Sequence, residues 1–226
     1  MRRYLGGLLA VLMSTAVYAH SGWHLAKEGD GIQVWKRRLA HSTMADFKAE
    51  VVVSSSLSGL VSLFYDANAA PQWMDHTSKV EMINRDDPSH SYTVHIETAM
   101  PWPAADRDAV LQGSWTQDPK SYVVTLHGHS VSWQDTPGFV RASVISDWTF
   151  VPLGDHKVKV IMSGHTDLGG YIPDWTVNML LQESPYATLE NLRQRISMTK
   201  YQQSHIDGII EPDDPTSLAR SHLVEH

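Results

Sequence analysis

The sequence predicts an α+β fold in which a curved antiparallel sheet wraps around one long C-terminal helix. Residues 79–166 read as short strands separated by turn residues, and residues 172–199 carry apolar side chains at helical spacing. An antiparallel sheet with one apolar face must cover that face, and the C-terminal helix is the only predicted element long enough to do so. A sheet that grips a helix leaves an internal hydrophobic tunnel, where apolar ligands can bind.

The first 19 residues read as a cleavable secretory signal. Arg2 and Arg3 form a charged start, an apolar run extends from Leu5 to Val17, and Ala19 ends a small-residue cleavage context. The run is shorter than the ~20 residues that a membrane-spanning helix needs. We therefore expect cleavage after Ala19, which leaves a periplasmic or secreted protein.

The charge balance excludes some partners. Removing residues 1–19 takes away Arg2 and Arg3, so the mature chain has 16 basic and 25 acidic residues. An acidic chain without a basic cluster is not expected to bind nucleic acid or to attach permanently to anionic lipid. Its length suits one domain, which we place at residues 20–199 and expect to be a monomer.

No cofactor or metal is expected. The chain has no cysteine, which excludes disulfides, thiolate metal sites and a cysteine nucleophile. Among the 13 histidines, His20 would be the new N-terminus, and His127 and His129 share one strand face. Neither arrangement has a third ligand at a recognisable spacing.

The N-terminal half begins with two strands and a helix. Residues 32–39 and 47–53 read as strands. Residues 56–65 then change to helical spacing, with serines at 54–56 that can cap the helix. Residues 69–74 predict a shorter helix or a turn.

The middle of the chain predicts an antiparallel meander that leads into the long helix. Its strands are expected at residues 79–84, 90–98, 107–116, 121–129, 139–151 and 157–166. The long helix follows at residues 172–199. Residues 200–226 have few large apolar side chains, and we expect them to form a polar C-terminal tail with little core contribution.

Alternation along these strands and the long helix gives candidate ligand-binding residues. They are Tyr92, Val94, Ile96, Tyr122, Val124, Leu126, Val160 and Met162 in the walls, and Trp175, Met179 and Leu180 in the covering helix. Trp73, after the first helix, is a further candidate. Each is also an ordinary core position. His95 and Glu97 have the opposite parity to Tyr92 and should face solvent, so no catalytic residue is assigned.

Specific motifs resemble those of START domains. They are Thr98–Val110 with its Pro-Trp-Pro turn and Arg-Asp pair, Trp23–Glu28, Gly29–Trp35, Pro71-Gln72-Trp73, Val140-Arg141-Ala142 and Gly170–Asn178. The resemblance extends over about residues 23–198. It implies a START-like helix-grip fold that holds one lipid between the sheet and the C-terminal helix, and hence binding and transfer of a lipid or other hydrophobic molecule, with transient membrane contact.

Two details limit what the resemblance implies. Some relatives carry a tunnel arginine on the strand after the Arg-Asp pair, but here Val110–Trp115 has none, so a sterol-type polar anchor is not carried over. Arg107 and Asp108 are adjacent on a strand and should make separate structural hydrogen bonds. The alternative is an enzyme, cyclase-like or hydrolase-like, acting on a hydrophobic substrate, because the wider helix-grip superfamily contains both.

Overall fold

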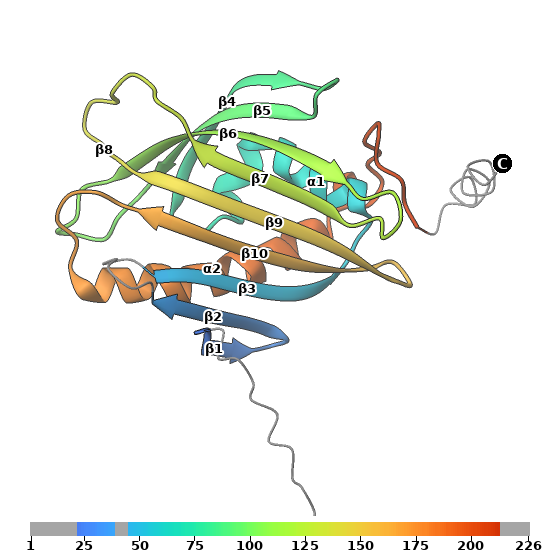
Figure 1. The fold of residues 1–226 in the computed structure, drawn as a ribbon, viewed down its shortest axis with the longest axis horizontal. Coiled ribbons are helices and arrows are strands. Elements are labelled where there is room, and N and C mark those ends of the chain that lie inside the picture. The colour runs from blue at the N-terminus through green and yellow to red at the C-terminus, as the bar shows by residue number, and fades with distance from the viewer. Residues whose placement is uncertain (1–21, 39–44, 213–226) are drawn as a thin grey trace, which may run out of the picture.

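Ten strands form one curved sheet in the computed structural model, which describes residues 22–38 and 45–212 (Figure 1). The predicted signal at residues 1–19 and residues 213–226 of the predicted tail lie outside this range. The strands are β1 (His24–Gly29), β2 (Ile32–Arg38), β3 (Ala45–Ser54), β4 (Thr77–Asp86), β5 (Ser91–Thr98), β6 (Arg107–Gln117), β7 (Val124–Ser130), β8 (Val140–Arg141), β9 (Ser143–Gly154) and β10 (Lys157–Asp167).

The order across the sheet is β1-β2-β3-β10-β9-β7-β6-β5-β4, and every pair on this path is antiparallel. The pairing of β3 with β10 joins the N-terminal strands to the later meander. Inner-face residues alternate with outer ones, so Val158 and Val160 are buried on β10 while Lys157 is exposed. This alternation fixes which side chains face the interior.

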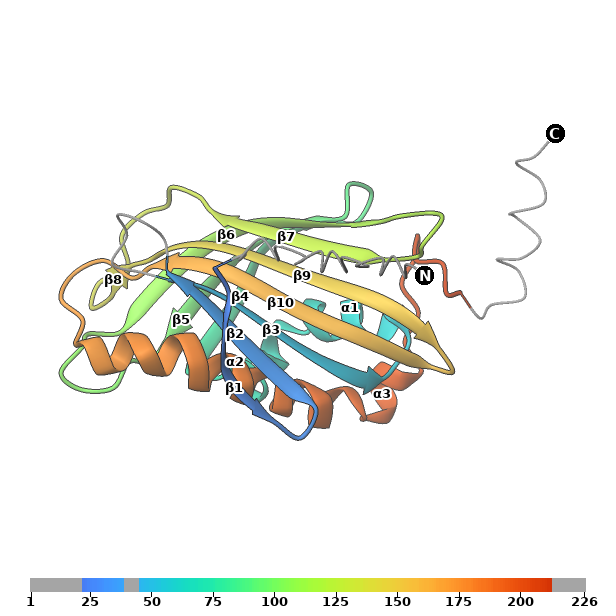
Figure 2. The same cartoon turned by 60° about the horizontal axis from the view of Figure 1, so that its bottom comes forward.

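The helices are α1 (Leu57–Tyr65), a 3-10 helix η1 (Ala67–Gln72), α2 (Asp174–Ile196) and α3 (Thr199–Gln202). Figure 2 shows α2 running beneath the concave side of the sheet. Its C-terminal half is anchored in the main core, where Leu189, Leu192 and Ile196 are fully buried. The predicted helix-grip α+β fold is therefore confirmed. No helix in the described ranges is both long and apolar enough to cross a membrane.

The strands differ from the prediction at three places. The sequence does not predict β1. The strand expected at residues 139–151 is two strands, because the Ala142 backbone donates to the carbonyl of Asp108 and holds β8 parallel to β6. Tyr122 lies before β7 in a turn with φ of 59°, so the expected alternation from Tyr122 to Leu126 is wrong at its first residue.

The expectation that residues beyond 199 contribute little to the core is wrong for residues 200–212. Tyr201 and Ile209 are buried in the main core. The side chain of Gln117 bonds to the backbone of Ile210 in both directions, at 2.8 Å each. The Glu211 carboxylate accepts from the first backbone amides of α1. This short segment therefore contributes to the core through two buried side chains, and it is held in place by specific hydrogen bonds.

Candidate functional site

Two adjacent cavities lie between the sheet and the helices. The first, of about 80 Å³, is lined by residues of α1, η1 and strands β4, β5, β6, β7 and β9. The second, of about 210 Å³, lies between α2 and the inner face of the sheet. Met74, Ile96, Leu111 and Ser146 line both, so the cavities meet at these residues.

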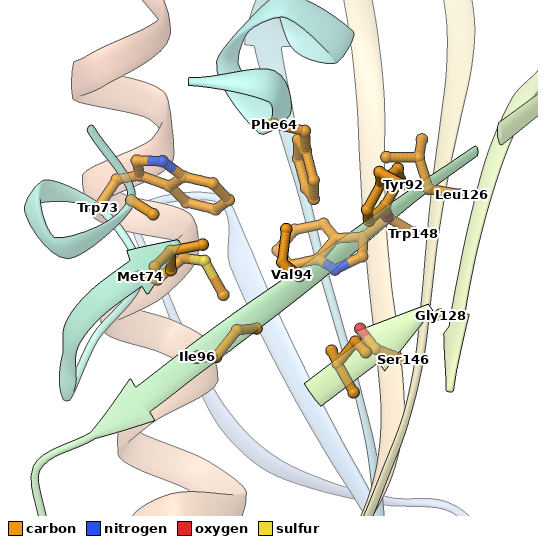
Figure 3. Close-up of a pocket in the computed structure, with 13 residues that line it drawn as sticks. Phe64, Trp73, Met74, Tyr92, Val94, Ile96, Leu126, Gly128, Ser146 and Trp148 are labelled. Carbon is orange, nitrogen blue, oxygen red and sulfur yellow. The ribbon is translucent and has the colours of Figure 1, made fainter. Parts of the chain in front are cut away.

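The first cavity has an apolar wall without a charged side chain (Figure 3). It is lined by Phe64, Ala70, Trp73, Met74, Val80, Tyr92, Val94, Ile96, Leu111, Leu126, Gly128, Ser146 and Trp148. Phe64 packs against Trp73 and Trp148 with ring centroids 5.1 and 4.9 Å apart. These rings hold one another in place.

A row of small residues crosses the inner face of the sheet. The register places Gly113 of β6 opposite Gly128 of β7, Gly128 opposite Ser146 of β9, and Ser146 opposite Gly164 of β10. The Tyr92 ring occupies the space over Gly113. Above Gly128, a Cβ atom would meet nothing closer than backbone oxygens at 3.9 Å. The row therefore leaves open space in the middle of the wall.

Arg107 closes one end of the second cavity by connecting two loops. Its guanidinium donates to the carbonyl oxygens of Ala105, Leu168, Gly169 and Tyr171. It thus ties the β5–β6 loop to the segment that precedes α2. Because these carbonyls use its donors, Arg107 is a structural residue, as its place in the sequence predicted.

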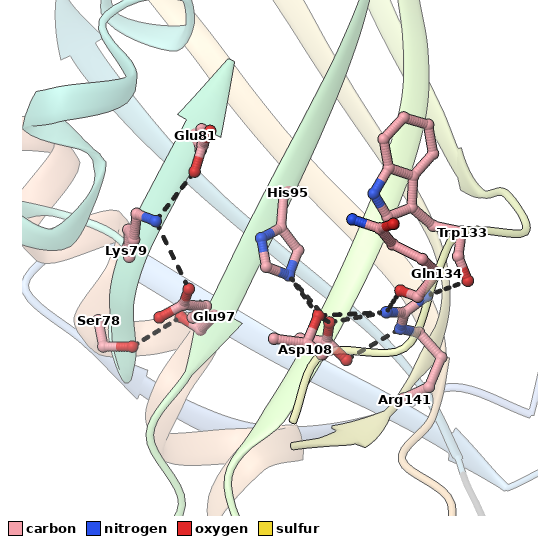
Figure 4. Close-up of polar contacts among 10 residues, drawn as sticks. Ser78, Lys79, Glu81, His95, Glu97, Asp108, Trp133, Gln134 and Arg141 are labelled. Atoms are coloured by element: carbon pink, nitrogen blue, oxygen red, sulfur yellow. Dashed lines mark hydrogen bonds and ion pairs between the residues drawn. The ribbon is translucent and has the colours of Figure 1, made fainter. Parts of the chain in front are cut away.

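Asp108 is buried on the opposite face of β6 (Figure 4). Arg141 donates to both of its carboxylate oxygens, at 2.9 and 2.8 Å, Thr136 donates at 2.6 Å, and His95 lies 2.9 Å away. Burial opposes ionisation, but these hydrogen bonds outweigh it and lower the pKa of Asp108 to about 2. The cluster fixes β5, β6 and β8 together, and Asp108 also borders the second cavity.

Seven of the twelve predicted ligand-binding residues line a cavity. They are Trp73, Tyr92, Val94, Ile96, Leu126, Met162 and Leu180. The other five lie elsewhere: Val124 and Val160 are fully buried in the core, Tyr122 packs at its edge, Met179 is half-buried, and Trp175 is 52% exposed.

Sequence reasoning missed Leu111, Ser146 and Trp148, although a signal for two of them was present. Val144, Ser146, Trp148 and Phe150 alternate along β9, and a serine in that series breaks an otherwise apolar face. Within the described ranges, no group of three or more His, Asp or Glu side chains could hold a metal ion. The ring centroids of His127 and His129 are 5.9 Å apart. The Nδ1 atom of His127 lies 2.6 Å from a carboxylate oxygen of Asp147.

The fold and the cavities define a helix-grip protein with an apolar interior. The START domain family matches residues 4–198. The chain belongs to the START domain family, as its motifs predicted.

The chain is also similar to known proteins and solved structures. The chain is 22% identical to an uncharacterized protein of Pseudomonas aeruginosa over 83% of this chain and 96% of that one. It is similar to the crystal structure of a STAR-related lipid transfer protein fragment from Xanthomonas axonopodis, with 30% identity, a TM-score of 0.72, and coverage of 78% and 99%. Human StAR-related lipid transfer protein 5 shares the fold, with 20% identity, a TM-score of 0.67, and coverage of 78% and 86%.

Proposed function

We propose that this protein binds one lipid or other hydrophobic molecule in the paired cavities and carries it through water. The observation that supports this most directly is the uncharged apolar wall of the first cavity, which continues into the second beneath α2. Moving an acyl chain from water into such a space yields about 0.8 kcal/mol per CH₂ group. The Xanthomonas relative is called a lipid transfer protein, which agrees with this role.

Each cavity is smaller than the roughly 300–1,000 Å³ of a typical ligand pocket. Entry of a whole lipid therefore requires movement of the N-terminal half of α2. This half is the easier part to move, because Leu180 and Val177 belong to a small satellite cluster with Leu168 rather than to the main core. The C-terminal half, with Leu189 and Leu192, would stay fixed.

Carriage would begin and end at a membrane. Trp102 and Tyr171 are 88% and 79% exposed, and Trp175 is half-exposed. Their chain neighbours Met100, Ile172 and Val177 pack in the same small cluster, which places the three aromatic side chains at one end of the molecule. Tryptophan and tyrosine favour the membrane–water interface. Together with the export signal predicted at residues 1–19, this makes the periplasm the proposed compartment.

Mass spectrometry of the protein purified from its native compartment tests binding, and transfer of labelled lipid between vesicles tests carriage. We expect a co-purified hydrophobic molecule, chemically unchanged, and faster transfer than without protein. Absence of both would contradict the proposal. A molecule recovered as a converted product would favour the alternative of an enzyme.

A further inference from the structure

Four polar side-chain groups occur in the otherwise apolar wall of the first cavity. They are the Tyr92 hydroxyl, the Ser146 hydroxyl and the indole N–H groups of Trp73 and Trp148. None of them forms a hydrogen bond with another described residue. Figure 3 shows the Trp148 nitrogen on the ring edge that faces the cavity, on the side of Ser146. The Trp73 nitrogen is buried without a partner. The other three groups border the cavity with their hydrogen-bonding capacity unused by the described residues, so a ligand or water inside the cavity can bond to them.

The register places the open space between two of these groups. Tyr92 lies over Gly113, its partner on β6. If Gly113 had a Cβ atom, that atom would lie only 2.7 Å from the tyrosine hydroxyl oxygen. Ser146 is the direct partner of Gly128 on the other side. A Cβ at Gly128 would have no atom closer than 3.9 Å, so the space above this residue is open. Because Tyr92 and Ser146 lie on its two sides, this space has a hydroxyl on each flank. Trp148 follows two residues along the same strand and faces the same side.

The chemistry of the surroundings excludes an ionised head group at this point. No lining residue of the first cavity is charged. In the second cavity, Arg107 donates to backbone carbonyls and Asp108 is paired with Arg141. A carboxylate or phosphate would be buried without a counter-charge, which is costly. Burial raises the pKa of Tyr92 to about 12, so its hydroxyl remains a hydrogen-bond donor at neutral pH.

We propose that the cavity selects hydrophobic molecules that carry one neutral hydroxyl or carbonyl group, held over Gly128 by Tyr92, Ser146 and Trp148. This inference rests on the proposed hydrophobic-ligand function and adds the chemical class of the ligand. A carbonyl would accept from the tyrosine and the indole. A hydroxyl would also donate to Ser146, while the apolar body extends past Ile96 and Leu111 into the second cavity.

The test compares three probes of equal chain length, 1-decanol, decanoate and decane, by displacement of Nile red at pH 7.5 from the full mature protein. We expect 1-decanol to bind at least tenfold more tightly than decanoate and several-fold more tightly than decane. Equal affinity for all three would overturn the inference and leave the proposed function standing. If no probe bound, both would fail.

Conservative variants locate the polar site. Tyr92→Phe and Ser146→Ala remove one hydroxyl each, and each should weaken 1-decanol binding about fivefold without changing decane binding. Tyr186→Phe is the matched control, because its hydroxyl lies near Asp30 outside both cavities. An unchanged preference for 1-decanol in the Tyr92 and Ser146 variants, with folding verified by circular dichroism, would contradict the assignment of these residues.

Discussion

The ring of Tyr92 lies over Gly113, its partner in the β5–β6 pairing, and a Cβ at Gly113 would be 2.6 Å from the tyrosine Cζ. Real Cβ atoms do not approach other atoms so closely, so glycine is required here for contact rather than for backbone freedom. The tyrosine can reach across the neighbouring strand only because that strand has no side chain at this point. The shape of the cavity depends on this pair.

Gly113→Ala should destabilise the protein by about 1–3 kcal/mol, because the added methyl group forces Tyr92 out of its position. Gly128→Ala is the matched control on the neighbouring strand, where a Cβ meets only ordinary contacts. We expect its free energy of unfolding to stay within about 1 kcal/mol of the wild type. Urea unfolding of both variants measures the difference, and equal losses would contradict the steric explanation.

Arg107→Lys should loosen the segment that precedes α2. A lysine ammonium lacks the planar fork that reaches the carbonyls of Leu168 and Gly169 together. We expect a loss of about 1–3 kcal/mol and faster amide hydrogen exchange in residues 168–173. Arg193→Lys is the control, since Arg193 contacts one exposed carbonyl, that of Asp30. Exchange as slow as in the wild type would show that the loop is held by other contacts.

Asp108→Asn should lower stability in a pH-dependent way. The pKa of Asp108 is about 2 in the folded protein, against ~3.9 for an unfolded chain. Its contribution, of about 2 kcal/mol, is therefore complete above about pH 4 and is lost as the pH falls towards 2. Urea unfolding at pH 7, 4 and 2.5 should show the gap between wild type and variant closing over the last interval. A gap of constant size would rule out ionisation as its source.

Glu211→Gln should weaken the start of α1. The Glu211 carboxylate accepts from the backbone amides of Leu57 at 2.9 Å and Ser58 at 2.8 Å, where an anion is favoured by the helix dipole. The amide side chain keeps one acceptor and loses the charge, so we expect a loss of about 1 kcal/mol. Asp207→Asn in the same segment, on a fully exposed side chain, should have no measurable effect on thermal unfolding. Equal melting temperatures for both variants would contradict a capping role.

Much of the site was predictable from alternation, and the failures have physical causes. Tyr92, Val94 and Ile96 were found because β5 alternates regularly and its inner face meets a cavity. Val124 and Val160 alternate in the same way, yet they face densely packed core. Periodicity reports which face of a strand is buried. It does not report whether the space in front of that face is filled.

The sequence by itself determined most of the strand and helix order, the family and the acidic charge, because these follow from local periodicity and from motifs along the chain. Only the tertiary structure decided where the cavity opens. Gly113, Gly128 and Ser146 lie on three different strands. They form one row only because the register of β6, β7 and β9 makes them direct partners. The same holds for Glu211, which caps a helix 153 positions away from it at Ser58. The row of small residues depends on strand register, and the Glu211 contact depends on where the C-terminal segment packs, and no local sequence pattern encodes either.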